Sequence, residues 1–311
     1  RQIERVSYAN VIKSYTGVHL TSNRPRGDEL HAIYVVPVAR FPFDRRSLDD
    51  NEPDFDEEQW RRRIIGVHYK RANLLSQIAG LSGELFLYGL QEDDSTKFQT
   101  PDRSYLTAGF RLFRPPLAGQ WDLDVEVAHR SGERRSSSNP DDTNDLDVDA
   151  SMLFARVGYT FNTAWQPRIA LQYYSTTGDE DPNDDRFDQF ERLFGGRRTD
   201  LNNTSIHGPL TPANLTALSV RFDVKPTARW DARLHLSKAQ LESATDAWVI
   251  AKLRDPSGQS GRSIGTTIDT RARYWMKRDQ LRLEFGASAL WFGEFAKNAP
   301  EAAEGDRTIF A

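Results

Sequence analysis

Arginine side chains recur in the middle of segments whose apolar and polar residues alternate, and they are the groups of this sequence best suited to chemistry. They stand at Arg111, Arg156, Arg168, Arg221, Arg233, Arg271, Arg273 and Arg282. Carboxylates lie among them, at Asp122, Asp124, Glu126, Asp223, Asp231, Asp269 and Glu284. A guanidinium group stays charged at any relevant pH and presents a planar fork that matches a carboxylate. A ladder of such forks would suit an anionic solute that must be attracted without being trapped.

The segments that carry these arginines have the two-residue period of half-buried β-strands. In 153–161, Leu153 and Val157 share one face, and Arg156 and Thr160 lie on the other. This alternation is typical of a strand with one apolar and one polar face. It repeats at 165–175, 216–225, 229–236, 268–277 and 281–291, and more weakly at 62–70, 82–90, 103–113 and 121–130. The sequence therefore predicts an all-β fold of about 12 or 13 antiparallel strands.

The connections between these segments alternate in length. Short turns are expected near Asn162, Pro226 and Arg278, and long polar stretches at 39–60, 131–146, 176–213 and 240–264. Outer-membrane barrels are built in this way, with short turns at one end and long loops at the other. We expect 176–213 to fold into the lumen, with a short helix at 186–194. Aromatic residues near strand ends would form the interfacial girdles: Tyr159, Phe161, Trp165, Trp230, Tyr274 and Trp291.

Composition restricts the possible classes of protein. The chain has 311 residues, only 38% of them hydrophobic but 11% aromatic, and its mean hydropathy is −0.65. No run of about 18 apolar residues occurs, which excludes a transmembrane helix. Cysteine is absent, so disulfides and thiolate chemistry are excluded. Low hydrophobicity with many aromatics favours a β-barrel whose interior is wet.

A soluble β-sandwich or jelly roll that binds glycans is the main alternative from another class. Its strands would alternate in the same way. The charged face would then be an outer surface in water, where cross-strand ion pairs contribute little. The number of arginines in the middle of strands favours a lumen over such a surface.

Catalytic and metal-binding motifs are absent. The six histidines lack HExxH spacing, and no P-loop, Gly-x-Ser-x-Gly elbow or nucleic-acid-binding motif occurs. We therefore expect no enzyme activity, no cofactor and no nucleic-acid partner. Asp179, Asp181 and Asp184 offer oxygen ligands of the kind that Ca²⁺ prefers, but without EF-hand spacing. A solvated external turn is the preferred interpretation of this acidic segment.

Several local signatures occur in a recognisable order. They are STTGDEDPND at 175–184, FERLFGGRR at 190–198, PANL at 212–215, DPSGQSGRSIG at 255–265, DTRARYW at 269–275 and LRLEFGA at 281–287. In order and spacing the chain resembles the alginate-export family of outer-membrane porins, most strongly over 150–311.

The resemblance implies an 18-stranded barrel in the outer membrane of a Gram-negative bacterium, with an arginine-rich pore for an anionic polysaccharide. Residues 1–311 would then be one barrel domain, with further strands before Arg1 and after Ala311. The implied partners are an alginate-like polymer or a smaller anionic solute, outer-membrane lipid and periplasmic export components. A general small-solute porin is the alternative within transport. The predicted pore-lining residues are Arg156, Arg168, Arg221, Arg233, Arg271, Arg273, Arg282, Asp269 and Glu284.

Overall fold

The computed structural model describes Ile3 and residues 13–25, 27–95, 97–195, 200–201, 208–278 and 280–310. Within this part of the chain, thirteen strands pair as one antiparallel meander in sequence order. They are β1 (Tyr15–Asn23), β2 (Glu29–Ala39), β4 (Arg62–Arg71), β5 (Ser82–Glu92), β6 (Ser104–Arg114), β7 (Gln120–Arg135), β8 (Asp145–Thr160), β9 (Arg168–Thr176), β11 (Leu215–Thr227), β12 (Trp230–Gln240), β13 (Ser263–Lys277), β14 (Leu281–Phe292) and β15 (Arg307–Phe310). The predicted strand content and topology are confirmed.

The remaining elements are short. Strand β3 (Glu57–Glu58) pairs with β2, and β10 (Arg186–Phe187) pairs in parallel with β8. Helices α1 (Arg45–Asp49) and α2 (Glu294–Asn298) lie in loops. Neither helix has the length and apolar composition needed to cross a membrane, and no other described helix does.

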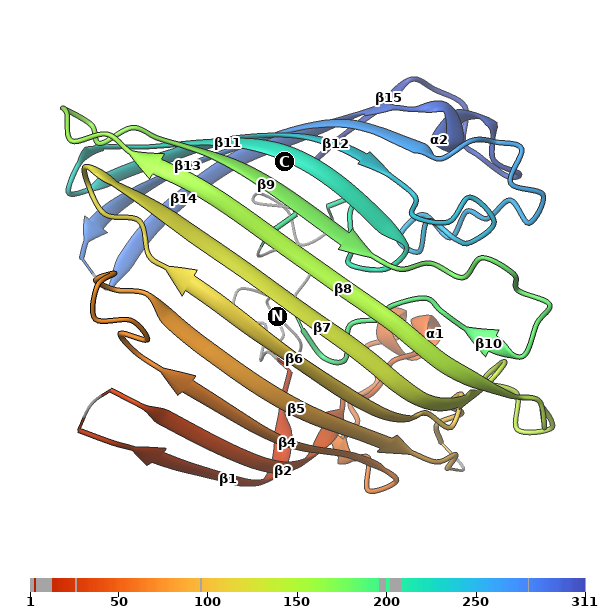
Figure 1. Ribbon diagram of the computed structural model, residues 1–311. Coiled ribbons are helices and arrows are strands. Elements are labelled where there is room, and N and C mark those ends of the chain that lie inside the picture. The colour runs from red at the N-terminus through yellow and green to blue at the C-terminus, as the bar shows by residue number, and fades with distance from the viewer. Residues whose placement is uncertain are drawn as a thin grey trace.

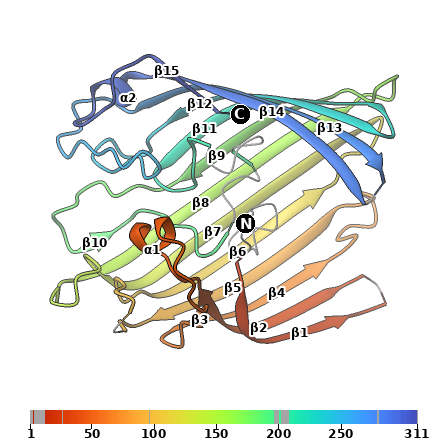
Figure 2. The same cartoon turned by 180° about the vertical axis from the view of Figure 1, so that it is seen from behind.

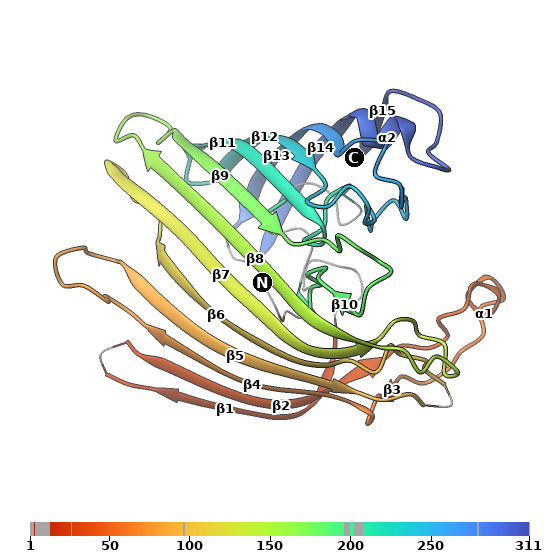
Figure 3. The same cartoon turned by 45° about the vertical axis from the view of Figure 1, so that its right-hand side comes forward.

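The sheet is a single curved layer, and its concave face is here called the lumen face (Figures 1 and 3). Strands β1 and β15 are the two ends of the pairing order. Short turns follow β1, β6, β8, β11 and β13, and they gather at one end of the strands, whereas α1, β10 and α2 lie at the other (Figure 2). The predicted separation into a short-turn end and a long-loop end is confirmed.

The two faces of the strands differ in the way that the alternation predicts. On β11, Val220 is 46% exposed on the convex face, whereas Ser219 is 1% exposed on the lumen face. Leu153, Val157, Leu171 and Leu283 are likewise exposed, and Leu234 is half-buried. No second sheet covers this apolar face in the described structure. The β-sandwich alternative is therefore not supported, because such a fold must bury its apolar face against another layer.

Aromatic rings cluster on the outer face at the short-turn end. The Trp121 and Tyr159 ring centroids lie 5.2 Å apart, and those of Trp230 and Tyr274 lie 4.7 Å apart. Trp121, Trp165 and Trp230 are exposed there. Amphipathic rings at this position are typical of an interfacial girdle.

The predicted helix at 186–194 is wrong. Arg186 and Phe187 pair with Asp147 and Val148 of β8, and the segment that follows has no regular structure. Its backbone groups bind distant partners instead: the Phe190 amide donates to the carbonyl of Thr177 at 2.9 Å, and the Thr177 hydroxyl donates to the carbonyl of Asp188 at 2.6 Å. These tertiary hydrogen bonds replace those that a helical turn would have made.

Candidate pore lining

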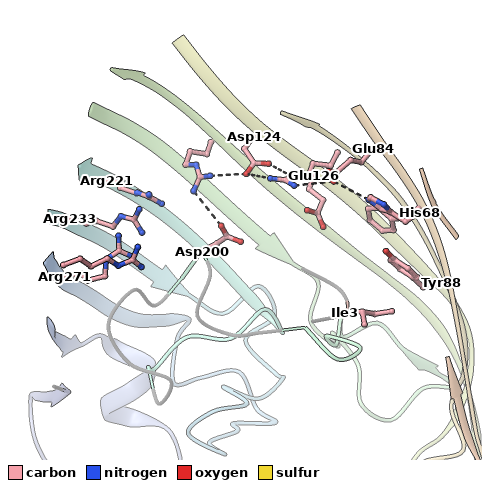
Figure 4. A pocket seen from close by; sticks show the side chains of 14 residues that line it. Ile3, His68, Glu84, Tyr88, Asp124, Glu126, Asp200, Arg221, Arg233 and Arg271 are labelled. Carbon is pink, nitrogen blue, oxygen red and sulfur yellow. Dashed lines mark hydrogen bonds and ion pairs between the residues drawn. The ribbon is translucent and has the colours of Figure 1, made fainter. Parts of the chain in front are cut away.

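A polar cavity of about 540 Å³ lies against the lumen face of the sheet (Figure 4). Four of its arginines gather on one side, and three carboxylates lie on the other side together with Arg111 and Arg156. It is lined by Ile3, His68, Glu84, Phe86, Tyr88, Arg111, Asp124, Glu126, Arg156, Asp200, Arg221, Arg233, Arg271 and Arg273. Among the lining residues there are thus six arginines and four acids.

The arginine side, here called the basic wall, consists of Arg221, Arg233, Arg271 and Arg273 on β11, β12 and β13. Arg233 and Arg271 stand directly opposite each other in the β12–β13 register. Like charges in that position repel each other, so neighbouring acids are needed. Acids on the two flanking strands, β12 and β14, pair with the β13 arginines: Arg271 Nη2 lies 3.3 Å from Asp231 Oδ1, and Arg273 Nε lies 3.1 Å from Glu284 Oε2.

Asp223 on β11 binds the two remaining arginines of the basic wall, Arg221 and Arg233. Its carboxylate accepts from Arg233 Nε at 2.6 Å, from Arg221 Nε at 2.9 Å and from Arg168 Nη1 at 3.0 Å. Asp223 pairs with Arg168 on one side and with Arg233 on the other in the strand register. One carboxylate thus fixes three guanidinium groups and leaves this wall with an excess of positive charge.

The carboxylate side, here called the acidic wall, consists of Glu84 on β5 with Asp124 and Glu126 on β7. Arg111 binds Asp124 through two nitrogens, Nε at 2.7 Å and Nη2 at 3.1 Å, and its Nη1 lies 3.4 Å from Glu84. Arg156 Nη2 lies 3.1 Å from the same Asp124. The predicted pore lining did not include this wall, although the two-residue spacing of Asp122, Asp124 and Glu126 is the signal that would have indicated it.

A second cavity of about 380 Å³ lies toward the short-turn end and shares all four basic-wall arginines with the first. Six basic side chains line it, Arg168, Arg221, Lys225, Arg233, Arg271 and Arg273, against two acids, Asp223 and Asp231. The excess of positive charge is therefore larger here than in the first cavity. The basic wall lies where the two cavities meet.

Arg168 reaches the lumen across a glycine. Its Nε and Nη2 atoms bind both carboxylate oxygens of Asp122 on β7, at 2.7 and 2.5 Å. Gly158 of β8 lies between them, and a Cβ at that position would stand 2.5 Å from Arg168 Nη2. Glycine at 158 therefore allows the guanidinium group to cross the strand.

Three predicted pore-lining residues, Arg282, Glu284 and Asp269, lie outside both cavities. Arg282 lies over the Trp275 ring at 5.2 Å and pairs with Glu284 at 3.0 Å. Asp269 is 3% exposed and stands opposite His235 and Ser288 in the strand register. Arg156, Arg168, Arg221, Arg233, Arg271 and Arg273 do line one or both cavities.

Part of the 177–214 connection is held against the lumen face by a second arginine cluster. This loop anchor consists of Glu191 with Arg103, Arg130 and Arg134. Glu191 lies 3.0 Å from Arg103 and 3.3 Å from Arg134, and Arg130 donates to its backbone carbonyl. Burial alone would raise the pKa of the Glu191 carboxyl, but attraction to Arg103 and Arg134 outweighs it and lowers that pKa. The adjacent Phe190 is fully buried, with Arg130 4.6 Å from its ring centroid.

The acidic turn around Asp181 makes hydrogen bonds within itself and to the 241–262 loop. Asp181 accepts hydrogen bonds from Asn183, and Asp184 accepts from the amide of Arg186. The Asp179 amide donates to Asp246 Oδ2 of the 241–262 loop at 3.0 Å. Across the described residues, no group of three or more His, Asp or Glu side chains could hold a metal ion.

Several solved structures with the same fold are outer-membrane porins of Pseudomonas aeruginosa. OccK5 (OpdH) matches with a TM-score of 0.55 at 11% identity, over 99% of this chain and 73% of that one. OccK11 (OpdR) gives 0.54 at 13% identity, over 99% and 71%. OccK2 (OpdF) in complex with glucuronate gives 0.53 at 13% identity, over 89% and 65%. No curated protein matches the chain in sequence.

The family comparison covers almost the whole chain. The model of a family described as alginate export matches residues 1–310. Its members are export channels of the outer membrane and not enzymes. The chain therefore belongs to the alginate export family and is an outer-membrane channel protein.

Proposed function

We propose that this channel passes anionic solutes that carry carboxylates, uronates in particular, along the basic wall. The observation that carries the proposal is the position of Arg221, Arg233, Arg271 and Arg273 between two polar cavities. A solute that moves from one cavity to the other meets the same four guanidinium groups throughout. Each can offer a planar pair of donors to a carboxylate.

The ion pairs within the basic wall would also allow a bound solute to leave. Asp223, Asp231 and Glu284 already bind these arginines at 2.6–3.3 Å. A passing carboxylate must compete with them, so its binding is weaker than binding to isolated arginines would be. Conduction requires this balance, because a solute that binds too tightly does not leave.

Two of the similar porins support this solute class. OccK2 was solved with glucuronate, and OpdK, also of P. aeruginosa, with vanillate. Both molecules carry a carboxylate on a ring. The family description favours a polymer of uronates, and the single sugar acid has the same charged group. We further propose that residues 1–311 are part of one barrel domain whose apolar outer face contacts outer-membrane lipid.

Reversal potentials in planar bilayers test the proposal, with the full-length protein under a KCl gradient. We expect anion selectivity that strengthens at low salt, because the Debye length is about 10 Å at 0.1 M. The triple variant R233E/R271E/R273E should become cation-selective, and R233Q/R271Q/R273Q, which adds no like charges, should lose most of the preference. A cation-selective wild type would refute the basic-wall mechanism.

Block of the chloride current by sodium glucuronate separates a uronate channel from a general porin. A uronate that occupies the basic wall should reduce the current in a saturable way, and the triple Gln variant should show little block. A non-saturable response, equal in wild type and variant, would favour the general small-solute porin instead.

A further inference from the structure

Three donor atoms of two neighbouring strands converge at the short-turn end of the lumen face, away from the basic wall. His19 and Thr21 lie on β1, and His31 on β2 stands directly opposite Thr21 in the register. The alternation places all three on the lumen face, because Leu20 between the first two and Leu30 beside the third are exposed on the outer face. We propose that His19, His31 and Thr21 bind a divalent transition-metal ion, for which Zn²⁺ is the reference.

The distances between the donor atoms suit a single cation. His19 Nε2 lies 2.9 Å from His31 Nδ1, and Thr21 Oγ1 lies 3.3 Å from the first nitrogen and 3.4 Å from the second. With Zn–N bonds of about 2.0–2.1 Å, two nitrogens in tetrahedral coordination are about 3.3 Å apart. The triangle of donors therefore needs to open by only a few tenths of an ångström to hold the ion.

A neighbouring carboxylate supports one of the ligands. Glu29 Oε2 lies 3.8 Å from His31 Nε2, the ring nitrogen that does not face the site. A carboxylate on that side favours the tautomer in which Nδ1 presents its lone pair. Glu29 is itself fixed by Lys70 at 2.9 Å. The carboxylate therefore lies beside the ring on the side away from the three donor atoms.

The surroundings also favour a cation. His68 of β4 stands opposite His31, with the ring centroids 5.9 Å apart, and it pairs with Glu84 of the acidic wall at 3.6 Å. Imidazole nitrogen suits zinc, copper and nickel better than calcium or magnesium. Two nitrogens and one hydroxyl leave coordination positions for water, so this is a smaller donor set than a closed structural zinc site. The inference stands independently of the solute that the basic wall passes.

The experiment is a titration of Zn²⁺ alone into the full-length protein in detergent, and binding is measured by isothermal titration calorimetry. We expect one site per chain. H19Q and H31Q should each weaken the affinity by at least tenfold, and E29Q by about tenfold, the size of effect seen when a ligand loses its supporting carboxylate. The matched control is H129Q: His129 on β7 has a hydroxyl and a carboxylate nearby, Ser151 at 3.2 Å and Asp149 at 3.7 Å, but among the described residues its ring contacts no second imidazole. H129Q should bind Zn²⁺ as the wild type does.

The absorption spectrum of Co²⁺ in the same protein gives a second readout, which does not depend on any variant. Visible bands of nitrogen-ligated Co²⁺ in the wild type, displaced by Zn²⁺, are expected. Heat-modifiable gel mobility identifies the variants that have kept the fold, and only these are compared. The inference is overturned if the wild type shows no such bands and no Zn²⁺ binding, or if a folded H19Q/H31Q double variant binds Zn²⁺ as tightly as the wild type.

Discussion

The basic wall and the loop anchor use the same residue type on the same face of the sheet for opposite purposes. In the loop anchor, Arg103 and Arg134 close on Glu191 of a distant loop, and Arg130 is buried beneath that loop. In the basic wall, Arg233 and Arg271 line two cavities and pair with acids on the strands, Asp223 and Asp231 respectively. We propose that an inward arginine is structural where another segment covers it and can meet solutes where it lines a cavity.

The basic wall and the loop anchor differ in the segment of the chain that supplies the carboxylate. Asp223, Asp231 and Glu284 stand on the strands beside their arginines, so they hold the guanidinium groups against the wall without covering them. Glu191 belongs to the 177–214 connection. Its backbone carbonyl accepts a hydrogen bond from Arg130, and the adjacent Phe190 is buried beside it. The comparison predicts that neutralising variants in the two regions will affect different measurements.

The largest effect on stability is expected at the loop anchor. E191Q would leave Arg134 beside a neutral amide, and loss of one partner of a buried ion pair costs about 3 kcal/mol. The loop should detach, so hydrogen exchange at the Phe190 amide should accelerate by roughly a hundredfold. Exchange measured by mass spectrometry on peptides that cover 178–195 checks this.

The matched control in the basic wall is R233Q. Asp223 keeps Arg168 and Arg221 as partners, so we expect a stability change below about 1 kcal/mol and unchanged exchange in the loop. The reversal potential should shift toward zero in R233Q and stay at the wild-type value in E191Q. If R233Q and E191Q changed loop exchange and the reversal potential equally, the distinction between a structural loop anchor and a solute-facing basic wall would be wrong.

A smaller effect distinguishes charge from geometry within the basic wall. The variant R233K/R271K/R273K keeps three positive charges but loses the planar forks. Anion selectivity should therefore persist, while the half-blocking concentration of glucuronate rises by about fivefold, or about 1 kcal/mol. Equal block in the Lys variant would show that the wall acts by charge alone.

The smallest effect concerns the external contact between the 177–214 and 241–262 loops. Burial, together with the nearby Asp246 carboxylate, raises the pKa of Asp179 to about 6 from its ordinary value of 3.8. A raised carboxyl pKa makes the folded contact most stable below pH 3.8, and this stability is lost as the pH rises through 6. Exchange of the Asp179 and Ser243 amides should therefore be slower at pH 4 than at pH 7, after correction for the intrinsic rate. In D179N this difference should be greatly reduced; an equally strong pH dependence in that variant would assign the titration to another group.

The sequence by itself determined the strands, their faces and the alternation of short and long connections. These follow from the two-residue period, which forces apolar and charged residues onto opposite faces wherever they occur. The period also placed six of the predicted arginines on the lumen face at the cavities. It could not separate Arg282 or Asp269 from them, because alternation gives the face of a residue but not its height along the barrel or what covers it.

Only the tertiary structure decided which charges are covered. The path of the 177–214 connection sets Glu191 on Arg103 and Arg134, and no local pattern in the sequence pairs residues that lie 57 and 88 positions apart. The same holds for the acidic wall, which faces the basic wall because the sheet curves (Figure 4). Curvature and loop path depend on contacts between distant segments, so they emerge only when the whole sheet has formed.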